Sequence, residues 1–127
     1  MKRRTFFQRL LGGLGLAAVS PVVVAEGGSL LIQGSPVAGF QFHRGDIVWP
    51  FLTVGAPLEL MREPNNSHDT NAVAVYYHDH KLGYVPRGDN SVIAQMLDRG
   101  ESLKATIIQL SEGEDPWERI HFNISLV

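Results

Sequence analysis

Alternation of apolar and polar residues predicts three consecutive strands in the middle of the chain. Residues 58–63 (LELMRE) alternate and stop at Pro64, which has no amide hydrogen to donate to a neighbouring strand. Residues 72–77 (AVAVYY) are rich in β-branched and aromatic side chains, which is typical of a central strand. Residues 78–81 (HDHK) form the tip of a hairpin, and residues 82–85 (LGYV) return as its second strand.

One segment has the periodicity of a helix. Within residues 90–99, apolar side chains recur at positions i, i+1, i+4 and i+5, so that they share one face of a helix. Asp89 or Asn90 is suited to cap its start, because short polar side chains accept hydrogen bonds from the first free amides. Gly100 is suited to end it, because glycine adopts the left-handed conformation that follows many helices.

The remaining strand candidates lie on either side of this region. Residues 102–110 and 119–127 are two strands joined by an acidic turn (SEGEDP). Residues 37–43 alternate loosely and predict a further strand with a partly buried aromatic face. Residues 26–35 contain a short apolar run between glycines and are either a linker or an edge strand; we favour the linker.

These elements predict a fold that is mainly β with one or two helices (β+α). A flat sheet of such short strands would leave long exposed edges, whose unpaired backbone groups invite association with other chains. Curling the sheet solves this problem because its two edges approach each other. We therefore predict a small, partly open β-barrel in a single domain over residues 36–127.

The first 25 residues have the profile of an export signal. A basic start (MKRRTFFQR) precedes an apolar stretch, residues 10–24, that is interrupted by glycines and Pro21. A membrane-spanning helix needs about 20 apolar residues in a row, so this stretch favours a cleaved signal peptide. Val23 and Ala25 are the small residues expected before a cleavage site after Ala25, which leaves no membrane span in the mature chain.

The paired arginines of the leader favour one export route. Residues 3–7 (RRTFF) resemble the start of twin-arginine signals, whose apolar segments are also rich in glycine. The alternative is a general secretory signal that begins with two arginines. Both routes end outside the cytoplasm, so the sequence predicts a periplasmic or extracellular protein.

Composition and charge narrow the classes of function. With 44% hydrophobic and 19% charged residues, the 127-residue chain has the composition of a folded protein, and its lack of cysteine excludes disulfides, thiolate nucleophiles and cysteine-bound zinc. The leader holds four of the eleven basic residues, so its removal leaves seven against thirteen acidic ones, a net charge of −6. Binding of nucleic acid by so acidic a domain requires a local pocket rather than a broad basic surface.

The densest polar segment, residues 62–71, lies between two predicted strands. Its Asn and Asp residues predict a rigid loop built on Asx turns or, alternatively, a binding loop. The pattern R-E-P-N-N-x-x-D-x-N-A-V-x-V, followed by L-G-Y-V-P-R, resembles the signature of the HIRAN domain. The resemblance covers roughly residues 36–127, and two linked motifs make it specific.

The resemblance implies a small OB-like barrel of the stand-alone bacterial type, without enzymatic activity. HIRAN domains of eukaryotic DNA translocases capture the free 3′-hydroxyl end of single-stranded DNA, so this resemblance implies a nucleic-acid or nucleotide 3′ end as the ligand. Recognition of an end requires a blunt pocket. In it a carboxylate accepts a hydrogen bond from the terminal hydroxyl, and an aromatic ring stacks on the terminal base.

The resemblance also implies roles for individual residues. Asp69 would accept the hydrogen bond of the terminal hydroxyl, Asn66 would bond the neighbouring base or sugar, and Arg87 would meet the last phosphate. His68 and Phe42 would stack on bases, at positions where the DNA-binding relatives carry Tyr. The full candidate set is Gln41, Phe42, Asn66, His68, Asp69, Tyr84 and Arg87, with Tyr84 lining the mouth and Gln41 standing where those relatives carry Arg. These departures remove one phosphate contact and one charge.

Two alternatives to nucleic-acid binding remain. The first is an exported scaffold that binds a protein or an envelope component and has lost DNA binding; the acidic charge and the leader favour it. The second is a zinc-binding domain, for which the candidates are His43, His68, Asp69, His78, Asp79, His80 and His121. Ser67, His68 and Asp69 are adjacent in sequence and so cannot form a catalytic triad, and neither an enzyme nor a resident cofactor is predicted.

Overall fold

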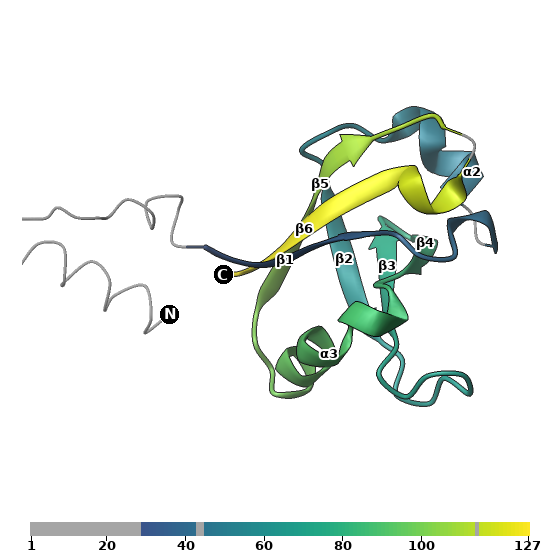
Figure 1. Ribbon diagram of the computed structural model, residues 1–127. Coiled ribbons are helices and arrows are strands. Elements are labelled where there is room, and N and C mark those ends of the chain that lie inside the picture. The colour runs from purple at the N-terminus through teal and green to yellow at the C-terminus, as the bar shows by residue number, and fades with distance from the viewer. Residues whose placement is uncertain (1–28, 43–44, 114) are drawn as a thin grey trace, which may run out of the picture.

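Six antiparallel strands form one curled sheet in the order β1-β6-β5-β2-β3-β4 (Figure 1). The computed structural model describes residues 29–42, 45–113 and 115–127, without the side chains of residues 42, 45 and 46. The predicted leader lies outside these residues. The strands are β1 (Leu30–Pro36), β2 (Pro57–Arg62), β3 (Val73–Tyr77), β4 (His80–Tyr84), β5 (Leu103–Leu110) and β6 (Ile120–Leu126). Within the described part of the chain, no helix is long and apolar enough to cross a membrane.

The two edges of the sheet meet at one point beyond the end of β1. Ala38 N donates to Tyr84 O at 2.8 Å, and Tyr84 N donates to Ala38 O at 2.9 Å. Gly83 permits this approach, because a Cβ there would lie 2.2 Å from the carbonyl oxygen of Ala38. The sheet is therefore a partly open, OB-like barrel, and the predicted fold class is confirmed.

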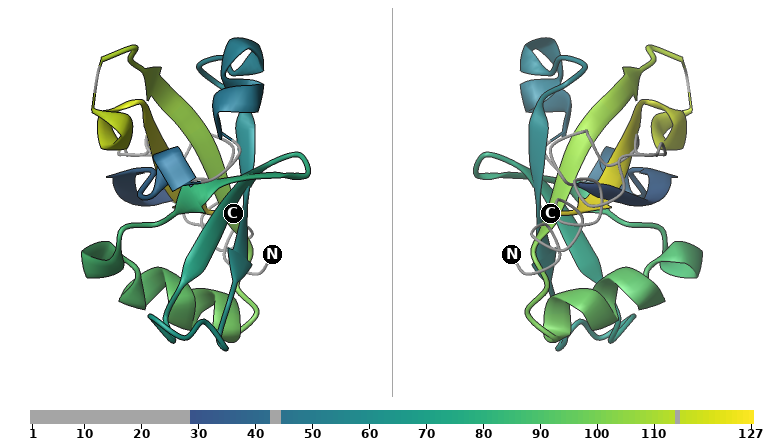
Figure 2. Two further views of the ribbon diagram at one scale, coloured as in Figure 1. Left: turned by 90° about the vertical axis from the view of Figure 1, so that its right-hand side faces the viewer. Right: turned by 90° about the vertical axis from the view of Figure 1, so that its left-hand side faces the viewer.

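Short helices cover the two ends of the barrel (Figure 2). Helix α3 (Ser91–Asp98) closes one end and buries Ile93 and Ala94 in the core. It ends as predicted: Gly100 has φ 84°, and its amide donates to the carbonyl of Leu97 at 3.0 Å. At the other end lie the one-turn elements α2 (Gly45–Val48) and η4 (Trp49–Phe51).

Alternate residues of the long strands build the core. Ile120, Phe122 and Ile124 of β6 point inward and are fully buried, as are Ala105 and Ile107 of β5. Strand β3 is buried along consecutive residues, as the central-strand prediction requires, because it lies between β2 and β4 with both faces covered. The predicted hairpin is confirmed, with its turn at His78 and Asp79 and its second strand beginning at His80.

Two predictions for the N-terminal part of the domain were wrong. Within residues 26–35, for which we favoured a linker, residues 30–35 belong to edge strand β1, which pairs with β6. A bulge between Leu31 and Gln33 breaks the alternation that would have marked this strand. Residues 37–42 are not a strand, and His43, the last residue of the predicted strand 37–43, lies outside the described residues. The chain turns at Gly39, with φ 74°, and enters a 3₁₀ helix, η3 (Phe40–Phe42), which buries Phe40.

Candidate nucleic-acid interface

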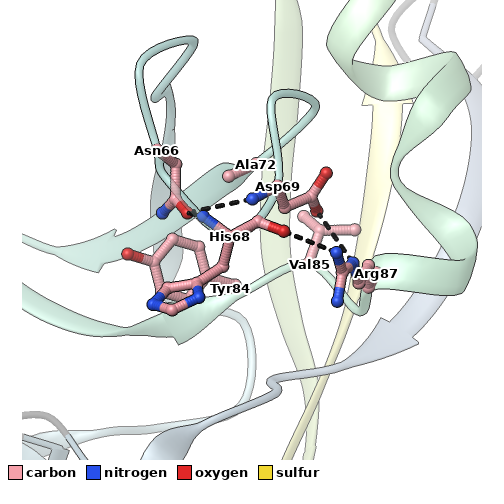
Figure 3. Close-up of a pocket in the computed structure, with 7 residues that line it drawn as sticks. All are labelled: Asn66, His68, Asp69, Ala72, Tyr84, Val85 and Arg87. Carbon is pink, nitrogen blue, oxygen red and sulfur yellow. Dashed lines mark hydrogen bonds and ion pairs between the residues drawn. The ribbon is translucent and has the colours of Figure 1, made fainter.

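One pocket brings together five of the seven candidate residues (Figure 3). Its volume is about 610 Å³, and it lies between the loop that joins β2 to β3, the end of β4 and the 3₁₀ helix η5 (Arg87–Asp89). The lining consists of Asn66, His68, Asp69, Ala72, Tyr84, Val85 and Arg87. Of the other two candidates, Gln41 has an exposed side chain in η3 and is not part of this lining, and the side chain of Phe42 lies outside the described structure.

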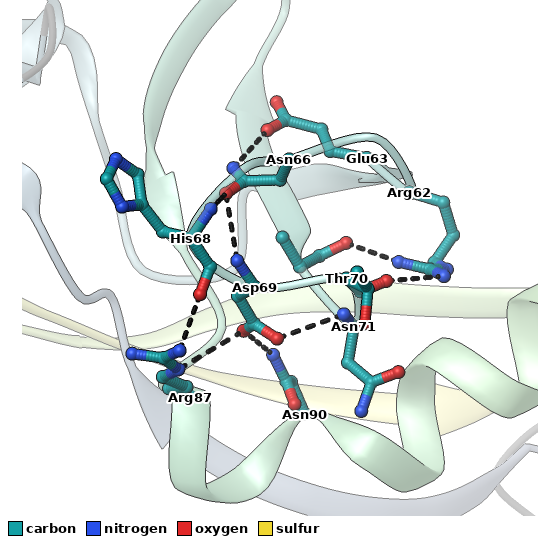
Figure 4. A network of polar contacts seen from close by, with 10 residues as sticks. Arg62, Glu63, Asn66, His68, Asp69, Thr70, Asn71, Arg87 and Asn90 are labelled. Atoms are coloured by element: carbon teal, nitrogen blue, oxygen red, sulfur yellow. Dashed lines mark hydrogen bonds and ion pairs between the residues drawn. The ribbon is translucent and has the colours of Figure 1, made fainter.

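Asx turns give the β2–β3 loop its shape (Figure 4). Asn66 Oδ1 accepts hydrogen bonds from the amides of His68 and Asp69 at 2.8 and 3.1 Å. Asp69 Oδ1 accepts one from the amide of Asn71 at 2.9 Å. The predicted Asx-turn loop is therefore present, and the turns that stiffen it also place His68 and Asp69 in the lining of the pocket.

Asp69 is an ionised hydrogen-bond acceptor in the pocket wall. Its Oδ2 accepts a hydrogen bond from Asn90 Nδ2 at 2.8 Å and lies 4.0 Å from Arg87 Nε. The hydrogen bonds from Asn71 and Asn90, with a smaller effect of the Arg87 charge, lower the pKa of this carboxyl group below its usual value of 3.8. About one-fifth of the side chain, 21%, remains exposed to solvent.

Asn90 has a different role from the predicted one. It occupies the N-cap position of α3, but its side chain makes no capping hydrogen bond. Instead the side chain is 2% exposed and donates to Asp69. A buried amide that donates to a carboxylate fixes the carboxylate's orientation, so Asn90 supports the pocket from behind.

Arg87 is the exposed cation of the pocket. Its side chain is 73% accessible to solvent, and Nη2 donates to the carbonyl oxygen of His68. A guanidinium group that is largely in water, with several N–H groups on one plane, can reach an anionic ligand without a large desolvation cost. The structure therefore places the Arg87 guanidinium next to the Asp69 carboxylate in the lining of one pocket.

Arg62 fastens the other end of the loop, a role that the sequence analysis did not assign. It donates through Nη1 to Ala72 O at 2.7 Å and through Nη2 to Thr70 O at 3.0 Å, and Nε is 2.9 Å from Asp98 Oδ1 of α3. The planar guanidinium joins loop and helix at once. The signal available in the sequence was an arginine at the next-to-last position of the predicted strand 58–63, close to a loop whose carbonyls need donors.

A second network lies behind the pocket and includes Lys81, which the sequence analysis placed only in the hairpin tip. Lys81 Nζ is 2.7 Å from Glu63 Oε2, and the Tyr84 hydroxyl donates to Glu63 Oε1 at 2.8 Å. Partial burial opposes ionisation of both groups, but the hydrogen bonds between them outweigh it. They lower the pKa of Glu63 and raise that of Lys81, so both stay charged.

The histidines do not gather into a metal site in the described residues. No group of three or more His, Asp or Glu side chains there is arranged to hold a metal ion. His78 lies at the exposed hairpin turn, where its ring meets the edge of Tyr77 at 4.4 Å between centroids. His43 lies outside the described residues.

An OB-like barrel with an acceptor, a cation and two rings in one pocket belongs to the class of small nucleic-acid-binding β-modules. A family model of the HIRAN domain matches residues 32–127, so the chain belongs to the HIRAN domain family. HIRAN domains are binding modules for single-stranded DNA. The match begins inside β1, four residues before the predicted start of the domain.

Individual relatives cover the same domain. The chain is 31% identical over 80 residues to a Fanconi-associated nuclease 1 homolog of Oryza sativa subsp. japonica; the match covers 60% of this chain and 8% of that protein. A crystal structure of a protein from Lactobacillus plantarum superposes with a TM-score of 0.66 at 28% identity, covering 77% of this chain and 94% of the other. The HIRAN domain of human HLTF superposes with a TM-score of 0.61 at 19% identity, covering 80% of each chain, and shares the fold.

Proposed function

We propose that this HIRAN domain is a non-enzymatic module whose pocket holds the free 3′-hydroxyl end of single-stranded DNA. The observation that carries the proposal is a carboxylate beside a cation, with Asp69 Oδ2 4.0 Å from Arg87 Nε in one pocket lining. A terminal nucleotide presents a hydroxyl, which donates to a carboxylate, and a phosphate, which is attracted to a guanidinium. The pair therefore matches the two groups that a DNA end brings together.

The aromatic rings of the pocket support binding of a terminal nucleotide whatever its base. His68 and Tyr84 both line it, and every base has a face that can stack on a ring. The described lining holds one carboxylate and one guanidinium, so charge there serves the sugar–phosphate end. We therefore expect binding with little preference for sequence and a marked preference for an unblocked end.

The test compares two oligonucleotides that differ only at the 3′ end. Short single strands labelled with fluorescein at the 5′ end, with either a free hydroxyl or a phosphate at the 3′ end, are titrated with the full-length chain and followed by fluorescence anisotropy. We expect the free end to bind about tenfold tighter or more, because a phosphate removes the donor and adds charge beside Asp69. The basic leader raises both affinities alike, so the ratio is the measurement that matters. Equal affinities, or no binding of either strand, would favour the scaffold alternative.

We also propose that residues 1–25 direct the domain out of the cytoplasm, by the twin-arginine route. The basic start, the short glycine-rich apolar stretch and the small residues before position 26 support this proposal. We expect the chain expressed in a Gram-negative host to appear in the periplasmic fraction with Glu26 as its first residue, as judged by mass spectrometry. Replacement of Arg3 and Arg4 with lysine is expected to stop export; a lysine variant exported normally would indicate the general secretory route.

A further inference from the structure

The pocket has two walls that come from separate parts of the chain. The β2–β3 loop supplies Asn66, His68 and Asp69, whereas β4 supplies Tyr84 (Figure 3). One oxygen atom joins the two walls: Glu63 Oε1 accepts hydrogen bonds from the Tyr84 hydroxyl at 2.8 Å and from Asn66 Nδ2 at 3.1 Å. Glu63 follows β2 directly and is not itself part of the lining. Its carboxylate therefore links β4 to the β2–β3 loop, and we call this carboxylate the joint.

Lys81 holds this joint in place. Its ammonium group lies 2.7 Å from Glu63 Oε2 and donates to the Tyr84 hydroxyl at 3.1 Å. The Lys81 and Glu63 side chains are 25% and 24% exposed, so their contact is shielded from water far more than an ion pair on the open surface. Without Lys81, the carboxylate would lose its charged partner and one of the constraints on its orientation.

The hydrogen bonds continue from the joint to the ligand-facing residues. Asn66 donates to Glu63 with its amide nitrogen, while its Oδ1 accepts from the amides of His68 and Asp69 (Figure 4). The orientation of the Glu63 carboxylate thus sets that of Asn66, and Asn66 sets the backbone that carries Asp69. A displacement of about 1 Å is enough to spoil recognition that depends on aligned hydrogen bonds.

We propose that Glu63 and Lys81 are positioning residues, which hold the loop against β4 so that the pocket can distinguish a free 3′ end from a blocked one. This proposal rests on the proposed function of the pocket. Neither residue lines the pocket, so their removal leaves every ligand-facing side chain in the sequence. Discrimination of the end, rather than binding as such, is the property that depends on them.

The first experiment measures the ratio of the two oligonucleotide affinities in full-length variants. Lys81→Met and Glu63→Gln are expected to bring the ratio towards one, and Lys81→Arg is expected to restore most of it. Loss of a positive charge weakens both oligonucleotides alike and does not alter the ratio. Asp98→Asn is the matched control, because it removes the Arg62 ion pair of similar length, 2.9 Å, on the side of the loop away from the pocket. An unchanged ratio in Lys81→Met, or an equal fall in Asp98→Asn, would overturn the proposal.

The second experiment needs no ligand and keeps the two proposals separable. Hydrogen exchange of the His68 and Asp69 amides is followed by NMR, with the amide of buried Phe122 as the reference for global unfolding. We expect both loop amides to exchange about tenfold faster or more in Lys81→Met, relative to Phe122, and at the wild-type rate in Asp98→Asn. If the wild type binds neither oligonucleotide, the proposed function fails. The exchange measurement still shows whether Lys81 and Glu63 hold the loop against β4. If the His68 and Asp69 amides exchange at the wild-type rate in Lys81→Met, the loop keeps its structure without Lys81 and the proposal is wrong.

Discussion

Replacement of Gly83 with alanine is expected to lower the free energy of unfolding by about 1–3 kcal/mol, the usual cost of forcing an extra group into a packed site. A Cβ at this position would lie 2.2 Å from the carbonyl oxygen of Ala38 and 2.8 Å from Val37 Cγ1, and both distances are too short for real contacts. The segment after β1 must therefore move away from β4. Because Ala38 is bonded to Tyr84 in both directions, this movement breaks the bridge that closes the barrel.

Gly88→Ala is the matched control for this experiment. A Cβ at Gly88 would have no atom within 4 Å, so the substitution is expected to be neutral or to stabilise the domain by about 0.4–1 kcal/mol through the unfolded chain. Urea denaturation followed by the fluorescence of Trp49 and Trp117 measures both variants. If Gly83→Ala and Gly88→Ala unfold within about 0.5 kcal/mol of each other, the close approach does not stabilise the barrel.

The sequence predicted the fold best for elements with one buried face and one solvent-exposed face. β5 and β6 bury alternate residues and α3 buries one helical face, so their periodicity is visible in the chain. Strand β3 of the hairpin is buried along consecutive residues, and its β-branched and aromatic composition predicted it instead. Edge strand β1 has a bulge, a glycine and a proline in seven residues, and the pattern is lost. The buried ring of Phe40 fits a strand as well as a turn, so only the positive φ of Gly39 decides between them.

The site was predictable for a different reason. The pocket-lining residues Asn66, His68 and Asp69 lie within four positions of each other and carry the motif, so the sequence itself brings them together. The supporting residues are distant in sequence: Lys81 reaches Glu63 across 18 positions, and Asn90 reaches Asp69 across 21. Such contacts depend on how β4 and α3 fold back against the loop, which no local pattern records.

Asp69→Asn is expected to abolish the preference for a free 3′ end while leaving the β2–β3 loop folded. The asparagine oxygen can still accept the amide of Asn71, as Asp69 Oδ1 does at 2.9 Å, but the ionised acceptor is lost. The affinity ratio of the two oligonucleotides should therefore fall about tenfold or more, towards one.

Arg87→Ala is expected to act differently from Asp69→Asn. It should weaken both oligonucleotides alike and reduce the slope of log K against log salt by about 0.7, because one phosphate contact disappears.

The buried neighbour of Asp69 provides the control that separates binding from folding. Asn90→Ala removes the 2.8 Å hydrogen bond that orients Asp69 but keeps the ionised acceptor, so stability should fall while the affinity ratio falls less than in Asp69→Asn. The pH dependence gives an independent check. Since the hydrogen bonds of Asn71 and Asn90 hold the pKa of Asp69 below 3.8, the carboxylate is ionised throughout the neutral and mildly acidic range. The affinity for a thymidine strand with a free 3′ hydroxyl should therefore be constant on acidification until the pH falls below 3.8. The blocked strand does not serve here, because its 3′ phosphate itself titrates at about pH 6. A loss of affinity for the free end around neutral pH would assign end recognition to a histidine instead.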